Sequence, residues 1–345
     1  MKITTIGIDL AKSVFQVHGV DARGKAVLRK QLKRKEMRPF FAQLPPCLVG
    51  MEACGSAHYW ARELQQFGHD VRLIAPQFVK PYVRSNKNDA ADAAAIAEAV
   101  SRPEMRFVPI KTAPAQALLA VHRARQGFIK QRTAQANQIR GLLAEFGIVI
   151  PTGLHRLFAQ LPEILEDGEN GLPGLMRQTV ARLRDHLRRL DQEVVALDCE
   201  IERWHRADPT SQRLAAVPGI GPITATALVA TFGHAETFHR ARQFAAALGV
   251  VPRQHSTGGK PTLLGISKRG DVYVRTLLIH GARAVIANLG RTSHPDPWLQ
   301  RLCTRRNANV AAVGLANKNA RIVWALLTRG ETYQPGHRVR QPRAA

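Results

Sequence analysis

The stretch KITTIGIDL, residues 2–10, is rich in β-branched and apolar residues, and its second-last residue is the acid Asp9. Such a run predicts a buried strand. The next stretch, SVFQVHGV at 13–20, alternates apolar and polar residues with a period of two, and KAVLRKQL at 25–32 does so more weakly. Short turns separate the three segments. The chain is therefore predicted to begin with a three-stranded meander.

The rest of the first hundred residues alternates between strand-like and helix-like segments. CLVGMEA at 47–53 predicts a buried strand that ends at Glu52. The segment that follows predicts a helix over 56–68, stopped by Gly68. We also expect a helix over 35–43, a strand over 70–75 and a helix over 89–101. This order predicts an α/β domain over residues 1–110.

Beyond residue 110 the pattern changes to long helices with few breakers. Helices are expected over 112–146 and 175–207, with a Gly- and Pro-bearing segment at 147–174 between them, which predicts a projecting helical arm over 111–209. A third, mainly helical domain is expected over 210–330. Its expected helices lie near 272–290, 296–306 and 307–329, and a basic, disordered tail is expected at 331–345.

The charge of the chain is strongly unbalanced. It has 50 Lys and Arg against 26 Asp and Glu, a formal net charge of +24. Three tracts, 105–144, 237–270 and 297–330, contain no acid but seven, six and six Lys or Arg. Because a solvated surface ordinarily mixes both signs, these tracts predict contacts with nucleic-acid phosphates. Aromatic residues make up only 6% of the chain, so stacking on bases is not the leading mode of binding.

Location and redox state follow from simpler features. No stretch approaches the roughly 18 apolar residues that a spanning helix needs. The N-terminal segment lacks the features of a secretory signal, so we expect a cytoplasmic protein. The cysteines show no CxxC spacing and are expected to be reduced and structural; they are Cys47, Cys54, Cys199 and Cys303.

Four carboxylates form the strongest chemical signal. Asp9 and Glu52 end predicted strands, and residues at strand ends face the crevice in which α/β sheets bind ligands. Asp89 and Asp92 lie three residues apart in the helix-forming run NKNDAADAAAIAEAV at 86–100. Each acid alone has an ordinary explanation, such as a solvated pair or a favourable helix terminus. Together and in this order they predict an RNase H-like nuclease core that holds Mg²⁺ or Mn²⁺.

The segment VPGIGPITA, residues 217–225, is similar to the glycine turn of a helix-hairpin-helix. Gly219 and Gly221 would let backbone N–H groups approach a phosphate at the start of the next helix. The alternative is a tight turn between two packed helices, without a ligand.

The segment 249–271 is rich in Gly, Ser and basic residues and lacks apolar periodicity, so we expect a loop. Ser256 lies in it among Arg253, His255 and Lys260, where a hydroxyl in a cationic pocket could attack a phosphate. From residue chemistry alone, a turn or a simple phosphate contact is the more economical explanation. Ser267 is expected to cap the following helix.

Several of these stretches resemble one family. IGIDLAKSVFQVHGVD, VGMEACGSAHYWARELQQFGHDVRLIAPQFVKPYV and KNDAADAAAIAEA are similar to the N-terminal RuvC-like DEDD domain of the IS110 insertion-sequence transposases. VPGIGPITATALVATFG and the segment from ARQFAAALG to HGARAV resemble their C-terminal domain. The resemblance covers most of residues 3–330, is nearest to the IS1111 subgroup, and extends to Piv-type DNA invertases.

This resemblance implies a DEDD tetrad of Asp9, Glu52, Asp89 and Asp92 that binds Mg²⁺ (or Mn²⁺), and a serine nucleophile at Ser256. It implies a DNA recombinase that forms a covalent phosphoserine intermediate. It further implies an element-encoded structured guide RNA (a bridge RNA) that pairs with double-stranded donor and target DNA. Two copies would form a homodimer through the arm, and two homodimers would form a tetramer. The resemblance also implies a bacterial protein of the cytoplasm that associates with the nucleoid.

Two other functions stay open from the sequence: a metal-dependent RuvC-like nuclease or Holliday-junction resolvase without a covalent serine intermediate, and a nucleic-acid-binding protein with a degenerate core. In every case the basic tracts and glycine turn should meet phosphates. The residues expected to do so are Arg123, Arg125, Lys130, Arg132, Arg140, Gly219, Gly221, Arg253, Lys260, Lys268 and Arg269.

Overall fold

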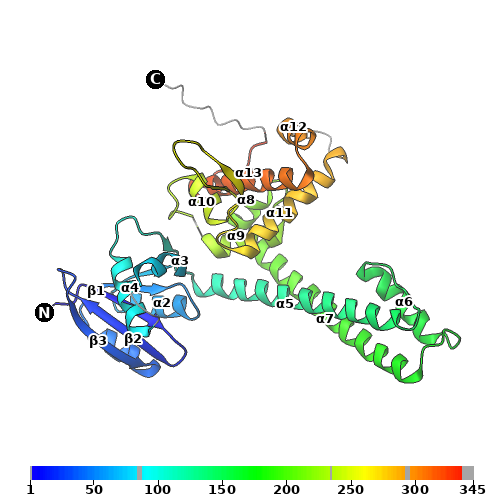
Figure 1. Ribbon diagram of the computed structural model, residues 1–345, viewed down its shortest axis with the longest axis horizontal. Coiled ribbons are helices and arrows are strands. Elements are labelled where there is room, and N and C mark those ends of the chain that lie inside the picture. The colour runs from blue at the N-terminus through cyan, green and yellow to red at the C-terminus, as the bar shows by residue number, and fades with distance from the viewer. Residues whose placement is uncertain (1, 84–87, 234, 292–295, 336–345) are drawn as a thin grey trace. The chain divides into compact units, whose positions relative to one another are not determined.

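The computed structural model describes residues 2–83, 88–233, 235–291 and 296–335 (Figure 1). The chain divides into two compact units, Met1–Gln116 and Ala117–Ala345. Among the described residues, no helix is both long and apolar enough to cross a bilayer. The tail beyond residue 335, which the sequence predicts to be disordered, lies outside the described part of the chain.

The N-terminal unit is built on a six-stranded mixed sheet of order β3-β2-β1-β4-β5-β6. β1, β4 and β5 are parallel, and β2, β3 and β6 run antiparallel to their neighbours. The predicted meander and both later strands are confirmed; the two-residue β6 was missed. The bounds are β1 Thr5–Leu10, β2 Val14–Val20, β3 Ala26–Lys33, β4 Leu48–Glu52, β5 Asp70–Ile74 and β6 Phe107–Val108.

Helices pack on this sheet. The three predicted helices are present as α1 Met37–Ala42, α2 Ala57–Gln66 and α4 Asp89–Val100, and a short 3-10 turn at Arg34–Glu36 precedes α1. A one-turn helix, α3 Pro76–Val79, continues into a 3-10 turn at Lys80–Tyr82. Trp60 and Leu64 of α2 join Phe15 and Val17 of β2 in one buried cluster, while Ile96 of α4 belongs to another.

Two glycines bring α4 unusually close to the sheet. A Cβ on Gly7 of β1 would lie 2.2 Å from the carbonyl oxygen of Ala93 and 2.4 Å from the nitrogen of Ala97. A Cβ on Gly50 of β4 would lie 2.8 Å from Cβ of Val100. The small residues of α4 complete the fit, because a helix of bulkier residues could not approach the strands this closely. The position of α4 is therefore fixed mainly by the absence of two side chains.

We expect Gly7→Ala to destabilise the N-terminal unit by about 3 kcal/mol, the upper end for overpacking, because its methyl group would meet backbone atoms that cannot rotate away. Hydrogen exchange of the β1 and α4 amides measures this effect. Gly55→Ala is the control, since no heavy atom lies within 4 Å of its added Cβ. Equal protection in the two variants would contradict the close contact.

The second unit contains a helical arm and a C-terminal bundle. The predicted long helices of the arm are present as α5 Ala113–Ala144, which begins in the first unit, and α7 Gly174–Ala207. Between them lies a further helix, α6 Leu154–Glu166, where the sequence suggested only a separating segment. Pro162 lies inside α6. Leu157 and Leu161 of α6 are buried against the arm, which explains why this helix forms despite its proline.

The C-terminal bundle has one extensive apolar core that includes Leu228, Phe244, Leu278 and Val323. The three helices predicted near its end are confirmed. The segment 249–271, expected to be a loop, instead contains a β-hairpin. The elements are α8 Pro209–Ala215, α9 Pro222–Phe232, α10 Ala241–Ala247, β7 Pro252–Gln254, β8 Leu263–Ile266, α11 Val272–Ala287, a 3-10 turn Leu289–Arg291, α12 Pro297–Arg305 and α13 Ala308–Arg329.

Candidate active site

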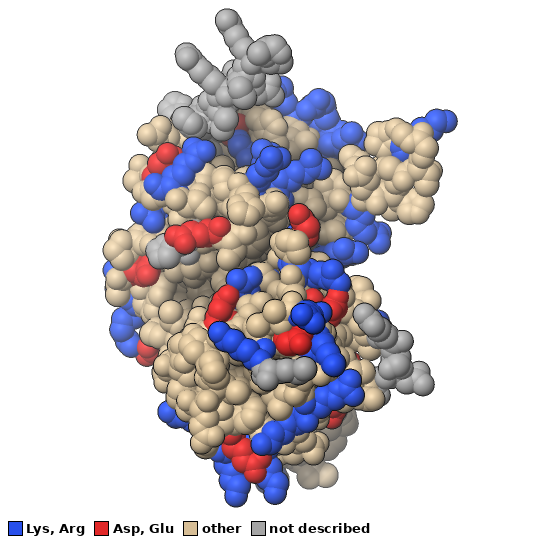
Figure 2. Space-filling model, turned by 90° about the vertical axis from the view of Figure 1, so that its left-hand side faces the viewer, with Lys and Arg blue, Asp and Glu red and all other residues tan. Residues whose placement is uncertain are grey.

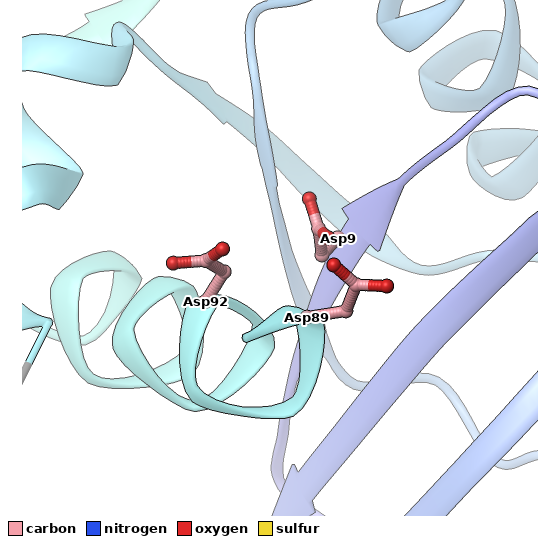
Figure 3. A group of neighbouring side chains, drawn as sticks. All are labelled: Asp9, Asp89 and Asp92. Carbon is pink, nitrogen blue, oxygen red and sulfur yellow. The ribbon is translucent and has the colours of Figure 1, made fainter. Parts of the chain in front are cut away.

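Three of the predicted carboxylates meet at one end of the sheet (Figure 3). Asp9 is the penultimate residue of β1, and Asp89 and Asp92 lie in the first turn of α4. One oxygen of each carboxylate lies within 4.8 Å of the corresponding oxygen of the other two. Asp89 is exposed and the others are half-buried, so the cluster is open to a ligand from solvent.

Local structure explains this convergence. The side chain of Asn88 caps α4 by accepting hydrogen bonds from the N–H groups of Ala90 (2.8 Å) and Ala91 (3.1 Å). The positive end of the helix dipole favours acids in the first turn. Side chains two residues apart share a face of a strand. A Cβ added at Gly7 would point at α4, so the side chain of Asp9 lies on the same side of β1. The close packing at Gly7 thus places the start of α4 beside Asp9.

Glu52 lies on the neighbouring strand. The parallel register pairs Ile8 with Met51, so Asp9 and Glu52 are the next residues of adjacent strands. Burial raises the pKa of the Cys54 thiol, and the negative charges of Glu52 and Asp9 raise it further, so both carboxylates lie near that sulfur. The group of three within 4.8 Å does not include Glu52. Its membership of a tetrad stays a prediction.

Three carboxylates this close repel one another unless a cation neutralises them. Oxygen ligands of this kind suit a hard divalent ion such as Mg²⁺ or Mn²⁺. The donor set therefore fits the metal that the sequence predicts.

Ser256 lies near the tip of the hairpin formed by β7 and β8. Its tight turn runs from Thr257 to Lys260, and Gly258 and Gly259 between them both have positive φ, 55° and 74°. Two residues with positive φ are what a two-residue hairpin turn of the type I′ family requires. The Gly-Gly pair was therefore a readable signal for the hairpin in the sequence.

The Ser256 hydroxyl is held in a defined way. Its Oγ accepts hydrogen bonds from Nε2 of Gln254 (2.9 Å) and from the N–H of Thr262 (3.2 Å). Because both partners donate, the hydroxyl's own hydrogen is free to go to a base. Ser256 is exposed, as are Arg253, His255 and Lys260 around it.

The base of this hairpin is fixed by residues that sequence reasoning missed. Arg275 of α11 is only 7% exposed, and its Nη1 donates to the carbonyl oxygens of Leu248 (3.2 Å) and Arg269 (3.0 Å), on either side of the hairpin. Nδ2 of Asn317 in α13 donates to the carbonyl of Val250 (3.0 Å). A basic residue in an already basic sequence gave no sign of such a role.

Ser267 does not cap α11 as predicted. Asp271 does so instead, because its side chain accepts a hydrogen bond from the N–H of Val274 (2.9 Å). The residues Lys268 and Arg269 beside it are exposed.

The basic residues of α5 differ in their surroundings. Arg125 forms an ion pair with Asp198 of α7, and Arg132 pairs with Asp191 at 2.5 Å, so these two guanidinium groups join the helices of the arm. Arg140 donates to the carbonyl of Gly153 (2.7 Å). Arg123 and Lys130 are exposed, which leaves them better placed for the phosphate contacts predicted for all five.

The glycine turn between α8 and α9 has a packing role. Gly219 has a φ of 87°, and a Cβ on Gly281 of α11 would lie 1.8 Å from the carbonyl oxygen of Gly219. The two backbones thus touch, which favours the alternative of a tight turn between packed helices. Gly221 is the N-cap residue of α9. Phosphate binding by either glycine stays a prediction.

A buried polar network joins the arm to the C-terminal bundle. His122 of α5 is fully buried, with Nε2 3.0 Å from Oγ1 of Thr226 and Nδ1 2.9 Å from the hydroxyl of Tyr273. The Thr226 hydroxyl donates to the carbonyl of Pro222 (2.8 Å), so it must accept from Nε2–H. Burial lowers the pKa of His122, so the imidazole is neutral near pH 7 and Nδ1 accepts from the Tyr273 hydroxyl.

We expect this network to weaken in acid. Burial, with the charge of Arg125 adding and that of Asp198 opposing, lowers the pKa of His122 from 6.5 to about 4. Between these values the unfolded chain binds a proton that the folded chain does not, so stability falls as the pH drops from 6.5 towards 4, by about 3 kcal/mol. Urea unfolding at several pH values should show a flatter pH dependence in His122→Gln. An equally steep one would contradict the neutral assignment.

The chain is similar to known transposases over most of its length. Residues 6–148 match a transposase family model for the DEDD domain of IS110 elements. Residues 211–295 match the model described as "Transposase IS116/IS110/IS902 family". A "Probable family 20 transposase" of Pseudomonas aeruginosa is 55% identical, over 97% of this chain and 100% of its own length. The transposase of insertion sequence IS1111A from Coxiella burnetii is 46% identical, over 97% of this chain and 92% of its own. That of IS1328 from Yersinia enterocolitica is 43% identical, over 96% and 98%.

Proposed function

Because the chain belongs to the IS110 family of insertion-sequence transposases, we propose that it cuts and rejoins DNA strands with a metal-binding carboxylate cluster and Ser256 as nucleophile. The convergence of Asp9, Asp89 and Asp92 from β1 and α4 is the observation that carries this proposal. The sheet order, with three parallel strands flanked by an antiparallel meander, supports an RNase H-like, RuvC-like core.

Asp9, Asp89 and Asp92, with Glu52 beside them, would hold Mg²⁺ or Mn²⁺. A divalent ion there would supply positive charge to the oxygens of a phosphodiester under attack. The carboxylates would bind that ion and hold it in position. The exposed Asp89 leaves the cluster open to a bulky nucleic-acid substrate.

Ser256 would act by transesterification. A bond forms between its Oγ and a DNA phosphorus, and the bond from that phosphorus to one sugar oxygen breaks. The serine hydroxyl loses its proton, and the departing sugar oxygen gains one. Attack by a hydroxyl of another DNA strand reverses these steps and joins the two strands. The two N–H donors on Oγ orient its lone pairs and leave its proton available for removal.

The finer parts of the proposal concern partners. The net charge of +24 supports binding of a structured, element-encoded guide RNA together with double-stranded donor and target DNA. If pairing with this RNA reads the target, the protein needs few base-specific contacts of its own. The helices α5 and α7 would join two copies into a dimer, and two dimers would form the working tetramer.

One experiment tests the chemistry as a whole. The protein is incubated with guide RNA, Mg²⁺ and suicide DNA substrates that trap a cut strand. A protein–DNA adduct that survives denaturation is the expected result. Cleavage without any adduct would contradict the serine step and favour attack by water, as in a resolvase.

A further inference from the structure

One face of the hairpin formed by β2 and β3 continues directly from the carboxylate cluster. The register pairs Asp9 of β1 with Gln16 of β2, and Gln16 with Gln31 of β3. Directly paired residues in a sheet point to the same side. Gln16 and Gln31 therefore extend from Asp9 across the α4 side of the sheet. With strands about 4.8 Å apart, Gln31 lies about 10 Å from β1.

The same side of β3 carries two cations. Arg29 pairs with His18 of β2, and His18 pairs with Gly7, whose missing Cβ would point at α4. Lys33 pairs with Val14. Arg29, Gln31 and Lys33 are all exposed. Burial lowers the pKa of His18, and the charge of Arg29 lowers it further, in keeping with an Arg29 side chain on this face.

The other side of the same strand differs sharply. Leu32 is buried there, and Nζ of Lys30 lies 5.1 Å from the centre of the Phe40 ring. Lys30 and Lys35 line a shallow depression together with Phe40, on the side of the sheet that α1 covers. Lys30 of β3 and Lys35 of the following 3-10 turn thus give the opposite side of the sheet two cations, as many as Arg29 and Lys33 give the α4 side.

Lysines on an edge strand can serve simply to prevent pairing with another sheet. That role does not account for polar residues on β2, an interior strand, where Gln16 and His18 occupy the half of the sheet beside α4. On β2 this face is partly covered by α4, and on β3 its polar and basic side chains are exposed. An exposed basic edge beside a cluster that would cut DNA matches a sugar–phosphate backbone in charge. Figure 2 shows one side of the molecule, with Lys and Arg spread over it and Asp and Glu among them.

We infer that the α4-side face of β2 and β3 binds the backbone of the DNA strand that enters the carboxylate cluster, with Arg29 and Lys33 contacting its phosphates. This inference rests on the proposed function. Since successive phosphates of a strand advance about 3.4 Å along the helix axis, the 10 Å from β1 to Gln31 spans about three nucleotides. Arg29 and Lys33 therefore contact the strand on one side of the cut.

The test compares two double variants that lose the same charge from the same region. Arg29→Gln with Lys33→Gln removes the cations of the proposed face, and Lys30→Gln with Lys35→Gln removes two cations of the opposite face. Both are made in full-length Asp9→Asn protein, so that the DNA stays intact. Affinity for a random-sequence DNA duplex and for a single strand is measured between 50 and 300 mM salt, on the order of the range in which phosphate contacts titrate.

The face variant should show a dependence of log K on log salt that is shallower by about 1.8 for duplex DNA, about 0.9 for each lost phosphate contact. The control should keep the parent slope. Equal changes in both variants, or none in either, would overturn the assignment to this face. An RNA hairpin of similar length forms a second arm, and a loss confined to RNA would overturn the assignment to DNA.

This experiment separates the two proposals. Cleavage by the Asp9→Asn protein itself would refute the proposed function, whatever the binding curves show. Inactive Asp9→Asn protein combined with indistinguishable double variants would refute only the binding face.

Discussion

Asp9→Asn is expected to reduce DNA strand cleavage by on the order of a thousandfold, without unfolding the N-terminal unit. The substitution keeps the size of the side chain but removes one of three negative charges that lie within 4.8 Å of one another. Losing one preorganised electrostatic element of a site typically costs two to three orders of magnitude in rate. Asp89→Asn and Asp92→Asn should behave alike, because they complete the same cluster from α4.

Metal affinity is a second measurement, independent of cleavage, for the three Asp→Asn variants. Mn²⁺ bound to the wild-type protein is measured by electron paramagnetic resonance, and each of the three variants should bind it at least about tenfold more weakly. Asp70→Asn is the matched control. Asp70 is the first residue of β5, whereas Asp9 is near the last residue of the parallel strand β1, and Asp70 pairs with Arg72 at the surface. Cleavage by Asp9→Asn at the rate of this control would refute the metal cluster.

Glu52→Gln decides between a cluster of three acids and a tetrad. Its backbone follows Met51, the partner of Ile8, so its carboxylate can reach the cluster from the adjacent strand. The tetrad predicts a loss of activity as large as that of Asp9→Asn.

Ser256→Ala should abolish the covalent adduct and lower strand rejoining by at least about ten-thousandfold, the scale on which loss of a nucleophile acts. The variant should stay folded, because Ser256 is exposed and the hairpin base is held by Arg275 and Asn317. Denaturing gel electrophoresis of the suicide-substrate reaction measures the adduct. Ser267→Ala, a second serine of the same segment, should form it normally.

A Ser256→Ala protein that still forms the adduct would mean that another hydroxyl is the nucleophile. In that case Ser267→Ala and Thr257→Ala identify it. Thr257 is exposed and Ser267 half-buried, and their positions at the same hairpin make them the nearest alternatives.

The sequence predicted much of the N-terminal unit because its central strands β1 and β4 are apolar and largely buried. Two runs, KITTIGIDL and the apolar segment that ends at Glu52, have compositions typical of buried strands. The proximity of Asp9 to Asp89 and Asp92 followed from the expectation that strand ends face a crevice. The reason for that proximity did not, because nothing in the spacing of Gly7 and Gly50 shows that a helix lies on them.

The second unit was harder to predict because its distinctive elements lack the usual signals. The strands β7 and β8 are exposed, so they show no alternation of apolar and polar residues. The helix α6 contains Pro162 and lies in a segment flanked by glycines, both signs of a break. The role of Arg275 depends on carbonyl oxygens that are distant in the chain, and no local pattern reveals it.

The intimate contact of α4 with Gly7 and Gly50 has an evolutionary corollary. Mobile elements accumulate mutations once selection on a copy relaxes, and a single added methyl group at Gly7 could silence this enzyme while every acid of its motif remains. A census of intact motifs would then overcount live copies. Scoring those two glycines alongside the acids offers a stricter criterion for telling active elements from relics.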